Sequence, residues 1–368
     1  MDRQRQATFM QREGLGTLLK LLGAAGYRCL GPQLRDGAIV YDTLETVDQL
    51  PQGWRDRQGP GAYRLERQAS PRQFAWANGP QALKPLLFSP REALWQVRRD
   101  GQGSLAFEAV APQADMLAVI GVRACDLAAL ALQDAHFLGQ THADPAYGAR
   151  RERLFLVAVD CTHPAATCFC ASTGDGPQAE AGFDLRLQEL DDGFLVTAGS
   201  EAGATVREKL DTREATAQEL AVVAEQAAAA VHSQRRHLPG QDLSDSLLTR
   251  QEHPHWHAVA ERCLSCGNCT AVCPTCFCYS EVEEPALKRE ASRHYREWDS
   301  CFTQGHSYIH GIVIHAETRH RYRQWLTHKL GTWHQQYGRS GCVGCGRCIS
   351  WCPAGIDLTA EAEAICHD

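Results

Sequence analysis

The pattern of apolar and polar positions predicts strands and helices in the front part of the chain. Residues 117–122 and 153–161 are short apolar runs typical of buried strands, and residues 126–138 repeat apolar positions at helical spacing. This strand–helix–strand order favours a parallel pair in a small α/β core. A further helix is predicted over 8–26, and a hairpin is predicted where 183–190 and 194–199 flank Asp191-Asp192-Gly193. Residues 50–115, rich in Gly, Pro and Arg, predict loops and short strands.

The rest of the pattern places a domain boundary near residue 240. Residues 213–235 are rich in Ala and Glu and predict a helix, and HLPGQDLSD at 237–245 is the best linker candidate. The segments after it are short and helical in character. The predicted fold class is therefore α+β, with an N-terminal α/β domain and mixed sheet over 1–240 and an α-helical domain over 241–368.

Charge and composition narrow the classes of partner. The 368 residues carry a formal net charge of −7 and a pI of about 6.1, which gives no reason to expect nucleic acid or an anionic membrane. The N-terminus lacks an apolar signal core, and no apolar run is long enough to span a membrane. We therefore expect a cytoplasmic protein, in which 17 cysteines indicate metal rather than disulfides.

One cysteine motif, C-x2-C-x2-C-x3-C-P, occurs twice, at 263–274 and 342–353. Three thiolates at this spacing can bind three irons of a cubane, and in two-cluster ferredoxins the fourth cysteine binds the other cluster. The first predicted [4Fe–4S] cluster is therefore held by Cys263, Cys266, Cys269 and Cys352. The second is held by Cys342, Cys345, Cys348 and Cys273.

Structural zinc is the alternative for such motifs, but zinc needs only four ligands per ion and no terminal C-P. Between the last cysteine of the first motif, Cys273, and the first of the second, Cys342, lie 68 residues, 274–341, which is long for a small bacterial-type ferredoxin. This spacer is mostly helical in its pattern. We therefore predict a helical type of ferredoxin domain, with the clusters between helices.

Other cysteines lie outside the two motifs. Cys125 and Cys161 end the two buried strands, and T-C-F-C carries Cys168 and Cys170 shortly after. If the strands are neighbours, these four thiols meet at the edge where α/β sheets bind ligands, and they could hold a third [4Fe–4S] cluster. Alternatively, the strand-end cysteines are ordinary buried side chains. The extra site could also be supplied or completed by Cys276, Cys278 and Cys301. The two remaining thiols, Cys29 and Cys366, look incidental.

The remaining motifs give weaker indications. The histidines of HPHWH, at 253–257, favour solvated or capping roles over metal binding. The basic run RHRYRQWLTHK, at 319–329, is typical of a solvated face, or else of a docking surface or a charge that stabilises reduced clusters. The sequence contains no G-x-G-x-x-G, Walker or G-x-S-x-G motif. It therefore gives no case for a flavin, nicotinamide or nucleotide site.

Several phrases are distinctive as a set: GVRACDLAAL, DPAYGARRERLFLVAVDCTHPAATCFCASTGDGP, EAGFDL, CLSCGNCTAVCPTCFC, REWDSCF and GRSGCVGCGRCISWCPAGID. Together with RDGAIVYD and GPQALKPLLFSPRE, they span most of the chain. The chain resembles the family of the β subunit of cytoplasmic sulfhydrogenases and the A subunit of anaerobic sulfite reductases. This resemblance implies an iron–sulfur electron-transfer subunit whose ligands are the eight motif cysteines.

The resemblance also implies partners. These are a flavin-binding subunit that reacts with NAD(P)H and a catalytic subunit, which in the hydrogenase branch is a [NiFe] large subunit with a small iron–sulfur subunit. We therefore predict a non-catalytic electron-transfer subunit of a soluble [NiFe] hydrogenase complex. The alternative within the family is an anaerobic sulfite reductase. From other classes, the alternatives are a redox-sensing iron–sulfur protein and a self-sufficient enzyme with its catalytic site at the upstream cysteines.

Overall fold

A large mixed sheet forms the front part of the molecule. The computed structural model describes residues 6–81, 83–139, 141–240, 243–287 and 291–367. The strand order in the sheet is β12 (Thr212–Glu214), β1 (Thr8–Gln11), β11 (Gly193–Ala198), β10 (Leu185–Glu189), β9 (Leu154–Val159), β8 (Leu117–Val122), β2 (Arg28–Arg35) and β3 (Ala38–Thr43).

The centre of this sheet is parallel. Strands β2, β8, β9 and β10 run side by side in one direction, with Leu117 opposite Leu154 in the central pair. All six residues of β8 are buried, as expected for a strand covered on both faces. The predicted parallel pair and the predicted β10–β11 hairpin are confirmed.

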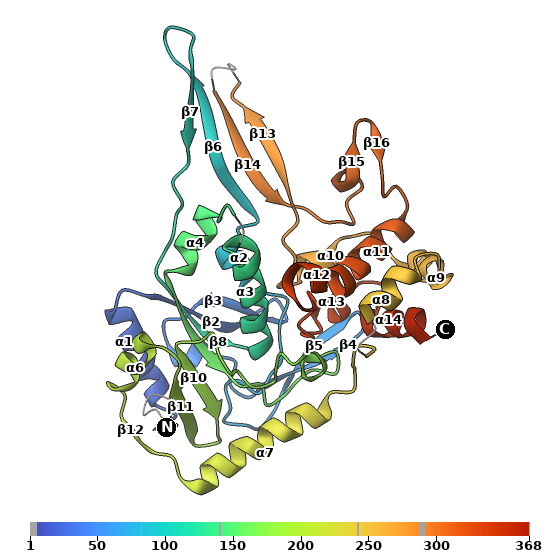
Figure 1. Cartoon of the computed structure of the whole chain (residues 1–368). Helices are drawn as coiled ribbons and strands as arrows, with labels where there is room; N and C mark the ends of the chain where they lie inside the picture. The colour runs from blue at the N-terminus through green and yellow to red at the C-terminus, as the bar shows by residue number, and fades with distance from the viewer. Residues whose placement is uncertain (1–5, 82, 140, 241–242, 288–290, 368) are drawn as a thin grey trace.

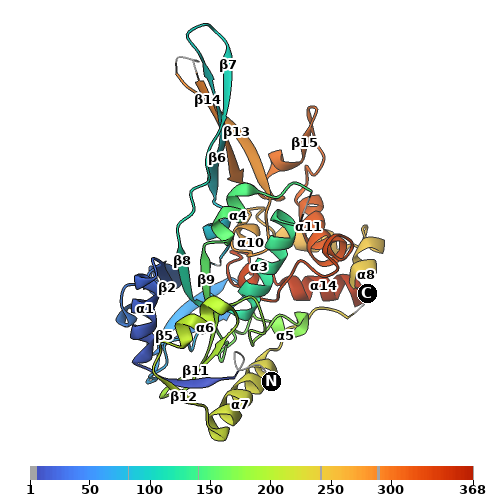
Figure 2. The ribbon, with the colours of Figure 1, turned by 60° about the vertical axis from the view of Figure 1, so that its left-hand side comes forward.

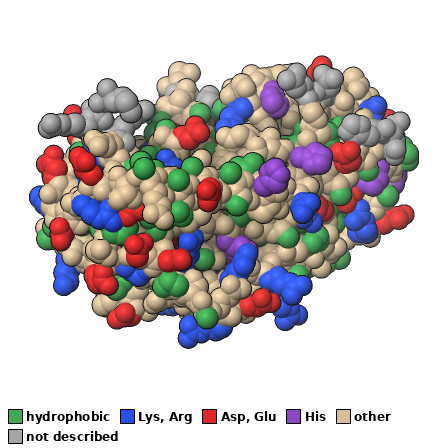
Figure 3. All heavy atoms as spheres, turned by 90° about the horizontal axis from the view of Figure 1, so that it is seen from below, with side chains coloured by type: hydrophobic (Ala, Val, Ile, Leu, Met, Phe, Trp, Pro, Cys, Tyr) green, Lys and Arg blue, Asp and Glu red, His purple; other side chains and the backbone are tan. Residues whose placement is uncertain are grey.

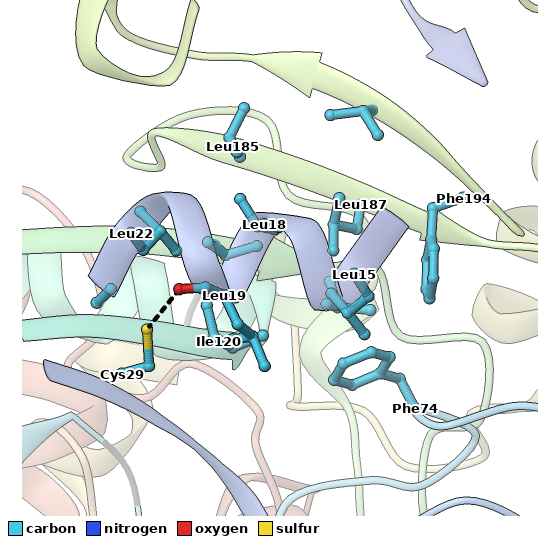
Figure 4. Close-up of a cluster of buried hydrophobic side chains, with 14 of the residues drawn as sticks. Leu15, Leu18, Leu19, Leu22, Cys29, Phe74, Ile120, Leu185, Leu187 and Phe194 are labelled. Atoms are coloured by element: carbon cyan, nitrogen blue, oxygen red, sulfur yellow. Dashed lines mark hydrogen bonds between the residues drawn. The ribbon is translucent and has the colours of Figure 1, made fainter. Parts of the chain in front are cut away.

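Helices cover both faces of the sheet. Leucines of α1 (Gly14–Ala24) pack on one face against Ile120, Leu187 and Phe194, as Figure 4 shows. On the opposite face, Leu127 of α3 (Ala124–Phe137) packs against Val119. Other helices of this part are α2 (Lys84–Leu87), α4 (Pro145–Arg151), α5 (Cys170–Thr173), α6 (Glu201–Arg207) and α7 (Ala217–Ser233). Successive side chains of β8 point to opposite faces of the sheet, so they are divided between two cores.

The helix predicted over 8–26 is wrong at its start. Residues Thr8–Gln11 form β1 between β11 and β12, and the helix begins only at Gly14. Within β1, Phe9 and Met10 are both buried but belong to cores on different faces. A helical pattern read from the leucines alone cannot separate these two residues from the helix that follows.

A second sheet joins segments far apart in the sequence. Strands β6 (Arg91–Arg99) and β7 (Leu105–Ala109) pair with β13 (Tyr279–Pro285) and β14 (Ala291–Trp298) in the order β13-β14-β6-β7. Figures 1 and 2 show this sheet as an arm that projects from the body. The prediction of a mostly helical spacer is wrong here, because pairing with β6 overrides the helix propensity of a segment rich in Glu, Lys and Arg.

The rest of the C-terminal part is helical, which confirms the α+β class. Its elements are α8 (Leu243–Thr249), α9 (His255–Arg262), α10 (Asn268–Ala271), α11 (Thr318–Thr327), the π-helical turn η4 (His328–Thr332), α12 (Trp333–Tyr337), α13 (Arg347–Ser350) and α14 (Leu358–His367). They enclose a core that includes Trp256, Trp325 and Ile365. The boundary near residue 240 stays a prediction, since Gln241 and Asp242 lie outside the described residues and the β6–β14 pairing crosses it.

Two short hairpins complete the fold: β4 (Trp54–Gly59) with β5 (Ala62–Arg67), and β15 (Tyr308–Ile309) with β16 (Ile312–Val313). Basic and acidic side chains are interspersed on the face shown in Figure 3. Among the helices of the described ranges, none has the length and apolar character that crossing a membrane requires.

Candidate metal centres

The two cysteine motifs fold into the same local structure. Gly267 and Gly346 follow the second cysteine of each motif, with φ of 75° and 73°. This left-handed conformation favours glycine because it has no Cβ. Each glycine precedes a short helix, α10 or α13, that carries the third cysteine, and the two helices pack against each other. The sequence repeat is therefore also a structural repeat, with the two loops face to face.

The first group of thiols surrounds one cavity. This cavity is lined by five cysteines, namely Cys263, Cys266, Cys269 and Cys352 together with Cys348 of the second motif. Its wall is apolar, formed by Phe302, Tyr322, Trp325 and Ile356. Burial raises the pKa of Cys263, and the nearby thiolates of Cys352 and Cys266 raise it further. The backbone N–H of Ile356 donates to Cys352 Sγ at 3.4 Å. The fourth cysteine of the second motif therefore lies with the first three of the first motif.

The second group lies deeper. Burial raises the pKa of Cys348 well above its ordinary value. The nearby cysteines Cys342, Cys345 and Cys273 raise it further. The backbone N–H of Gly344 donates to Cys342 Sγ at 3.5 Å. Here the fourth cysteine of the first motif accompanies the first three of the second. Both groups have the soft, thiol-only donor set that suits an iron–sulfur cluster, so the residues present fit the predicted cofactors.

A buried lysine stands beside the second group. Lys329 is only 5% exposed, and its Nζ donates to Thr275 Oγ1 at 2.8 Å. Burial acts to lower the pKa of Lys329, but the thiolates of Cys273 and Cys276 raise it above its ordinary value. The prediction that the basic run 319–329 forms a solvated face is therefore wrong at Lys329, which is buried beside the cysteines.

The upstream cysteines also come together. Cys125 follows β8 in the first turn of α3, and Cys161 follows β9, so both lie at the carboxyl edge of the parallel strands. Burial raises the pKa of Cys170 to about 12, with Cys161 the next contribution. Burial likewise raises the pKa of Cys168 well above its ordinary value, and the nearby Cys161 and Cys170 raise it further. Cys125 and Cys170 pack in one cluster with Cys345.

The other downstream cysteines lie elsewhere. Cys276 is hydrogen-bonded to Cys273, and it lines a cavity with Cys278 and Lys84. Cys278 hydrogen-bonds His306 and so raises the pKa of this histidine to about 9, against the effect of burial. Cys301 lies near Cys278, on the side of the first group. The structure thus places these thiols beside the two motifs rather than with Cys125.

The remaining candidates have structural roles. His253 Nδ1 accepts from the backbone N–H of His255 at 3.2 Å, and His255 Nε2 lies 2.6 Å from Glu361 Oε2. These contacts agree with the predicted capping roles. Cys29 is buried under α1, and Cys366 is half-buried on α14. In the ranges that the structure describes, no three His, Cys, Asp or Glu side chains are arranged to hold a single metal ion.

Several residues around the thiols were not predicted from sequence. Asn78 Nδ2 donates to Cys125 Sγ at 3.1 Å, and Gln234 Nε2 donates to Cys170 Sγ at 3.4 Å. Lys84 Nζ donates to the Ala271 carbonyl at 3.0 Å, beneath the first motif. Lys84 lies in the phrase GPQALKPLLFSPRE, but nothing in that phrase indicates its contact with the first motif, and Asn78 and Gln234 lie outside every motif of the sequence.

Comparison with known proteins agrees with this geometry. The family model of the 4Fe-4S dicluster domain matches residues 262–356, the span of both motifs. Sulfhydrogenase 2 subunit beta from Pyrococcus furiosus is 33% identical over 289 residues, which is 74% of this chain and 79% of that protein. No solved structure matches the chain. The chain therefore belongs to the family of the sulfhydrogenase β subunit, with a 4Fe-4S dicluster domain in its C-terminal part.

Proposed function

We propose that this chain is the electron-transfer subunit of a hydrogenase-type complex and that it holds two [4Fe–4S] clusters. The observation that carries the proposal is the exchange of fourth cysteines between the motifs. Cys352 lies with the first three cysteines of the first motif, and Cys273 lies with those of the second. The proposed ligand sets are Cys263, Cys266, Cys269 and Cys352 for the first cluster, and Cys342, Cys345, Cys348 and Cys273 for the second.

The protein around the thiols suits one-electron transfer. When bound, such clusters accept and release single electrons at potentials set by charge, hydrogen bonds and burial. The apolar wall of the first cavity excludes water, and backbone N–H groups point at Cys352 and Cys342. Cys266 is exposed, so the first group reaches the surface, while Cys342 is buried. This arrangement gives the first group access to a partner protein and keeps the second inside.

The proposed partners follow from the relative. The curated protein is named as a sulfhydrogenase subunit, which favours the hydrogenase branch over sulfite reductase. We propose a flavin-containing NAD(P)H-reacting subunit on one side of the electron path and a [NiFe] large subunit with its small subunit on the other. We also propose that the chain works in the cytoplasm and that it transfers electrons without a catalytic site of its own. The described chain offers thiol groups for electron carriers and no nucleotide-binding motif.

The test is cluster analysis of the full chain prepared anaerobically. We expect iron and sulfide in equal amounts, at least about eight irons per chain for two cubanes, and EPR signals of reduced [4Fe–4S] centres. Because the fourth ligands are exchanged, Cys352→Ser should disturb the first centre, although the other three ligands of that centre lie in the first motif. Cys273→Ser should likewise disturb the second centre. Cys366→Ser, a half-buried thiol outside every group, is the control and should change neither.

Two results would overturn the proposal. Zinc in place of iron in the anaerobic protein would exclude electron transfer by these thiols. If Cys352→Ser instead disturbed the centre held by Cys342 and Cys345, the exchanged assignment would be wrong. For the partner proposal, hydrogen should reduce the centres when the [NiFe] subunits are present and leave them oxidised when the subunits are omitted. Reduction by hydrogen without those subunits would contradict a purely electron-transferring role.

A further inference from the structure

The upstream thiols occupy a site that the sheet topology builds. Because β8 and β9 are parallel neighbours, the residues after each strand emerge at the same edge. Cys125 enters α3 from that edge, and Cys161 begins the loop that leads to Cys168 and Cys170. Cys125, Cys168 and Cys170 are buried, and Cys161 is half-buried. Thiols from the two strand ends and from the loop after β9 are thus gathered at one edge of the sheet.

Hydrogen-bond donors point at two of these sulfurs. Asn78 Nδ2 lies 3.1 Å from Cys125 Sγ. Gln234 Nε2 lies 3.4 Å from Cys170 Sγ, and its amide orientation is set by the Ala171 N–H, which donates to Oε1 at 3.0 Å. Amide donors favour a sulfur that carries negative charge, as a metal-bound thiolate does. An ordinary buried thiol, which is a small apolar group, does not require such donors.

A buried cation lies below the same site. Arg123 is 1% exposed, and in the described part of the chain its four hydrogen bonds all end on backbone carbonyls, of Val159, Asp160, Phe74 and Trp76. Among the residues that the structure describes, its Nε finds no hydrogen-bond partner. A buried charge whose hydrogen bonds reach no carboxylate is costly unless an anion lies near. Arg123 lies close enough to Cys161 to favour negative charge on its sulfur, so the guanidinium would offer a counter-charge to a metal-bound thiolate there.

The site is also in direct contact with the second cysteine motif. The Phe169 N–H donates to the Gly344 carbonyl at 2.8 Å, and Thr167 Oγ1 lies 2.8 Å from Ser350 Oγ. Cys168 Sγ lies 3.7 Å from the carbonyl oxygen of Cys345. The T-C-F-C loop and the loop of the second motif therefore touch through their backbones, with a sulfur of one against the cysteine of the other.

We propose that Cys125, Cys161, Cys168 and Cys170 bind a third iron–sulfur cluster of the [4Fe–4S] type. This inference rests on the proposed function, because the site gains a role only if the neighbouring motifs hold clusters. The second group then lies between the other two, since Cys348 neighbours Cys269 and Cys345 neighbours Cys168. Electrons that enter at the exposed Cys266 side could thus be carried into the N-terminal α/β part of the molecule.

The first experiment counts iron in the full chain after anaerobic preparation. We expect about twelve irons and twelve sulfides per chain, and about eight in Cys168→Ser, because each cubane holds four irons. Cys29→Ser is the matched control: this buried thiol lies under α1, outside the three groups, and the variant should keep about twelve. Eight irons in the unaltered chain, with no loss in Cys168→Ser, would overturn the third cluster and leave the two-cluster proposal intact. One zinc beside eight irons would also overturn it. Absence of iron would instead defeat the proposed function.

A second experiment does not depend on removing a ligand. Asn78→Ala deletes the donor to Cys125 and retains all four thiols. We expect iron to stay at about twelve while one EPR-detected centre shifts to a more negative midpoint, because the donor stabilises the reduced, more negative cluster. The other two centres should keep their midpoints. If no centre shifts, or if the centre disturbed by Cys342→Ser shifts instead, Cys125 is not a ligand of a separate cluster.

Discussion

At the scale of single residues, Lys329 places a buried charge beside the second group of thiols. It sits among Cys273, Cys276 and Cys342, and its Nζ is held by Thr275 Oγ1. A nearby cation stabilises the reduced form of a cluster, which carries one more negative charge. We therefore expect Lys329→Met to lower the midpoint potential of one centre by on the order of 60 mV, a tenfold change in a one-electron equilibrium. A redox titration followed by EPR measures this shift.

The matched control at this scale is Lys20→Met, since Lys20 is exposed on α1, in the N-terminal part. This variant removes the same charge from the chain, and solvent screening should leave every midpoint where it was. Equal shifts in both variants would mean that net charge, rather than the buried position, sets the potential. An unchanged midpoint in Lys329→Met would mean that the lysine has only a packing role.

At this scale the sequence could predict which cysteines share a loop, but not which side chains surround those cysteines. The cysteines of each motif are local, so their spacing alone indicates which three share a loop. Lys329 could be read only as part of a basic run, because its burial depends on η4 turning it toward Thr275. Asn78 and Gln234 reach the upstream thiols from loops distant in sequence. Contacts of this kind are set by tertiary packing, which a single chain does not reveal.

At the scale of elements, the contact between the T-C-F-C loop and the second motif requires glycine at 344. Its φ is +62°, and a Cβ there would lie 2.5 Å from Cys170 N. We expect Gly344→Ala to reduce the free energy of unfolding by several kcal/mol, well above the roughly 1 kcal/mol of a left-handed alanine alone. It should also release iron from the upstream thiols. Anaerobic urea denaturation and iron analysis measure the two effects.

Gly338 is the matched control for this element, with φ of +73° and no atom of the described ranges within 4 Å of its Cβ position. Gly338→Ala should show only the backbone term, about 1 kcal/mol, and should keep its iron. If the two variants were equally destabilised, the loops would not be held together at residue 344. The comparison separates backbone conformation from the close approach of the two cysteine loops.

The elements that the sequence predicted well are those whose pattern is fixed by local burial. Strands β8 and β9 are apolar throughout because helices cover both faces. The helix predicted over 213–235 begins only at Ala217, after the capping box of Thr216 and Glu219, because Thr212–Glu214 form β12 beside β1. Strands β13 and β14 were missed because β14, besides its local hairpin with β13, pairs with β6, whose residues lie 193 to 206 positions earlier in the chain. Half-exposed strands of charged residues carry almost no periodic signal of their own.

At the scale of the whole molecule, buried ion pairs join the two parts of the chain, and the most deeply buried of those described is Arg347 with Asp126. Arg347, in the second motif, donates to both carboxylate oxygens of Asp126 on α3, at 2.7 and 3.1 Å. It also donates to the carbonyls of Gly79 and Gln81, each at 3.0 Å. The side chains of the pair are only 1% and 2% exposed. The predicted boundary near residue 240 therefore separates two segments of sequence that share an interior.

This shared interior predicts that the two parts unfold together. Removing one partner of a buried pair leaves an unpaired charge, so we expect Arg347→Met to reduce the free energy of unfolding by about 3–5 kcal/mol. Arg347→Met with Asp126→Leu should cost clearly less than the sum of the single changes, because neither charge is then left alone. Arg213→Met, which breaks an ion pair of exposed Arg213 with Glu219, should cost less than about 1 kcal/mol.

Anaerobic urea denaturation, followed by circular dichroism and by cluster absorbance, measures these differences. Transitions that coincide in both signals support one cooperative unit, whereas a separate, earlier loss of cluster absorbance would show that the cysteine region unfolds on its own.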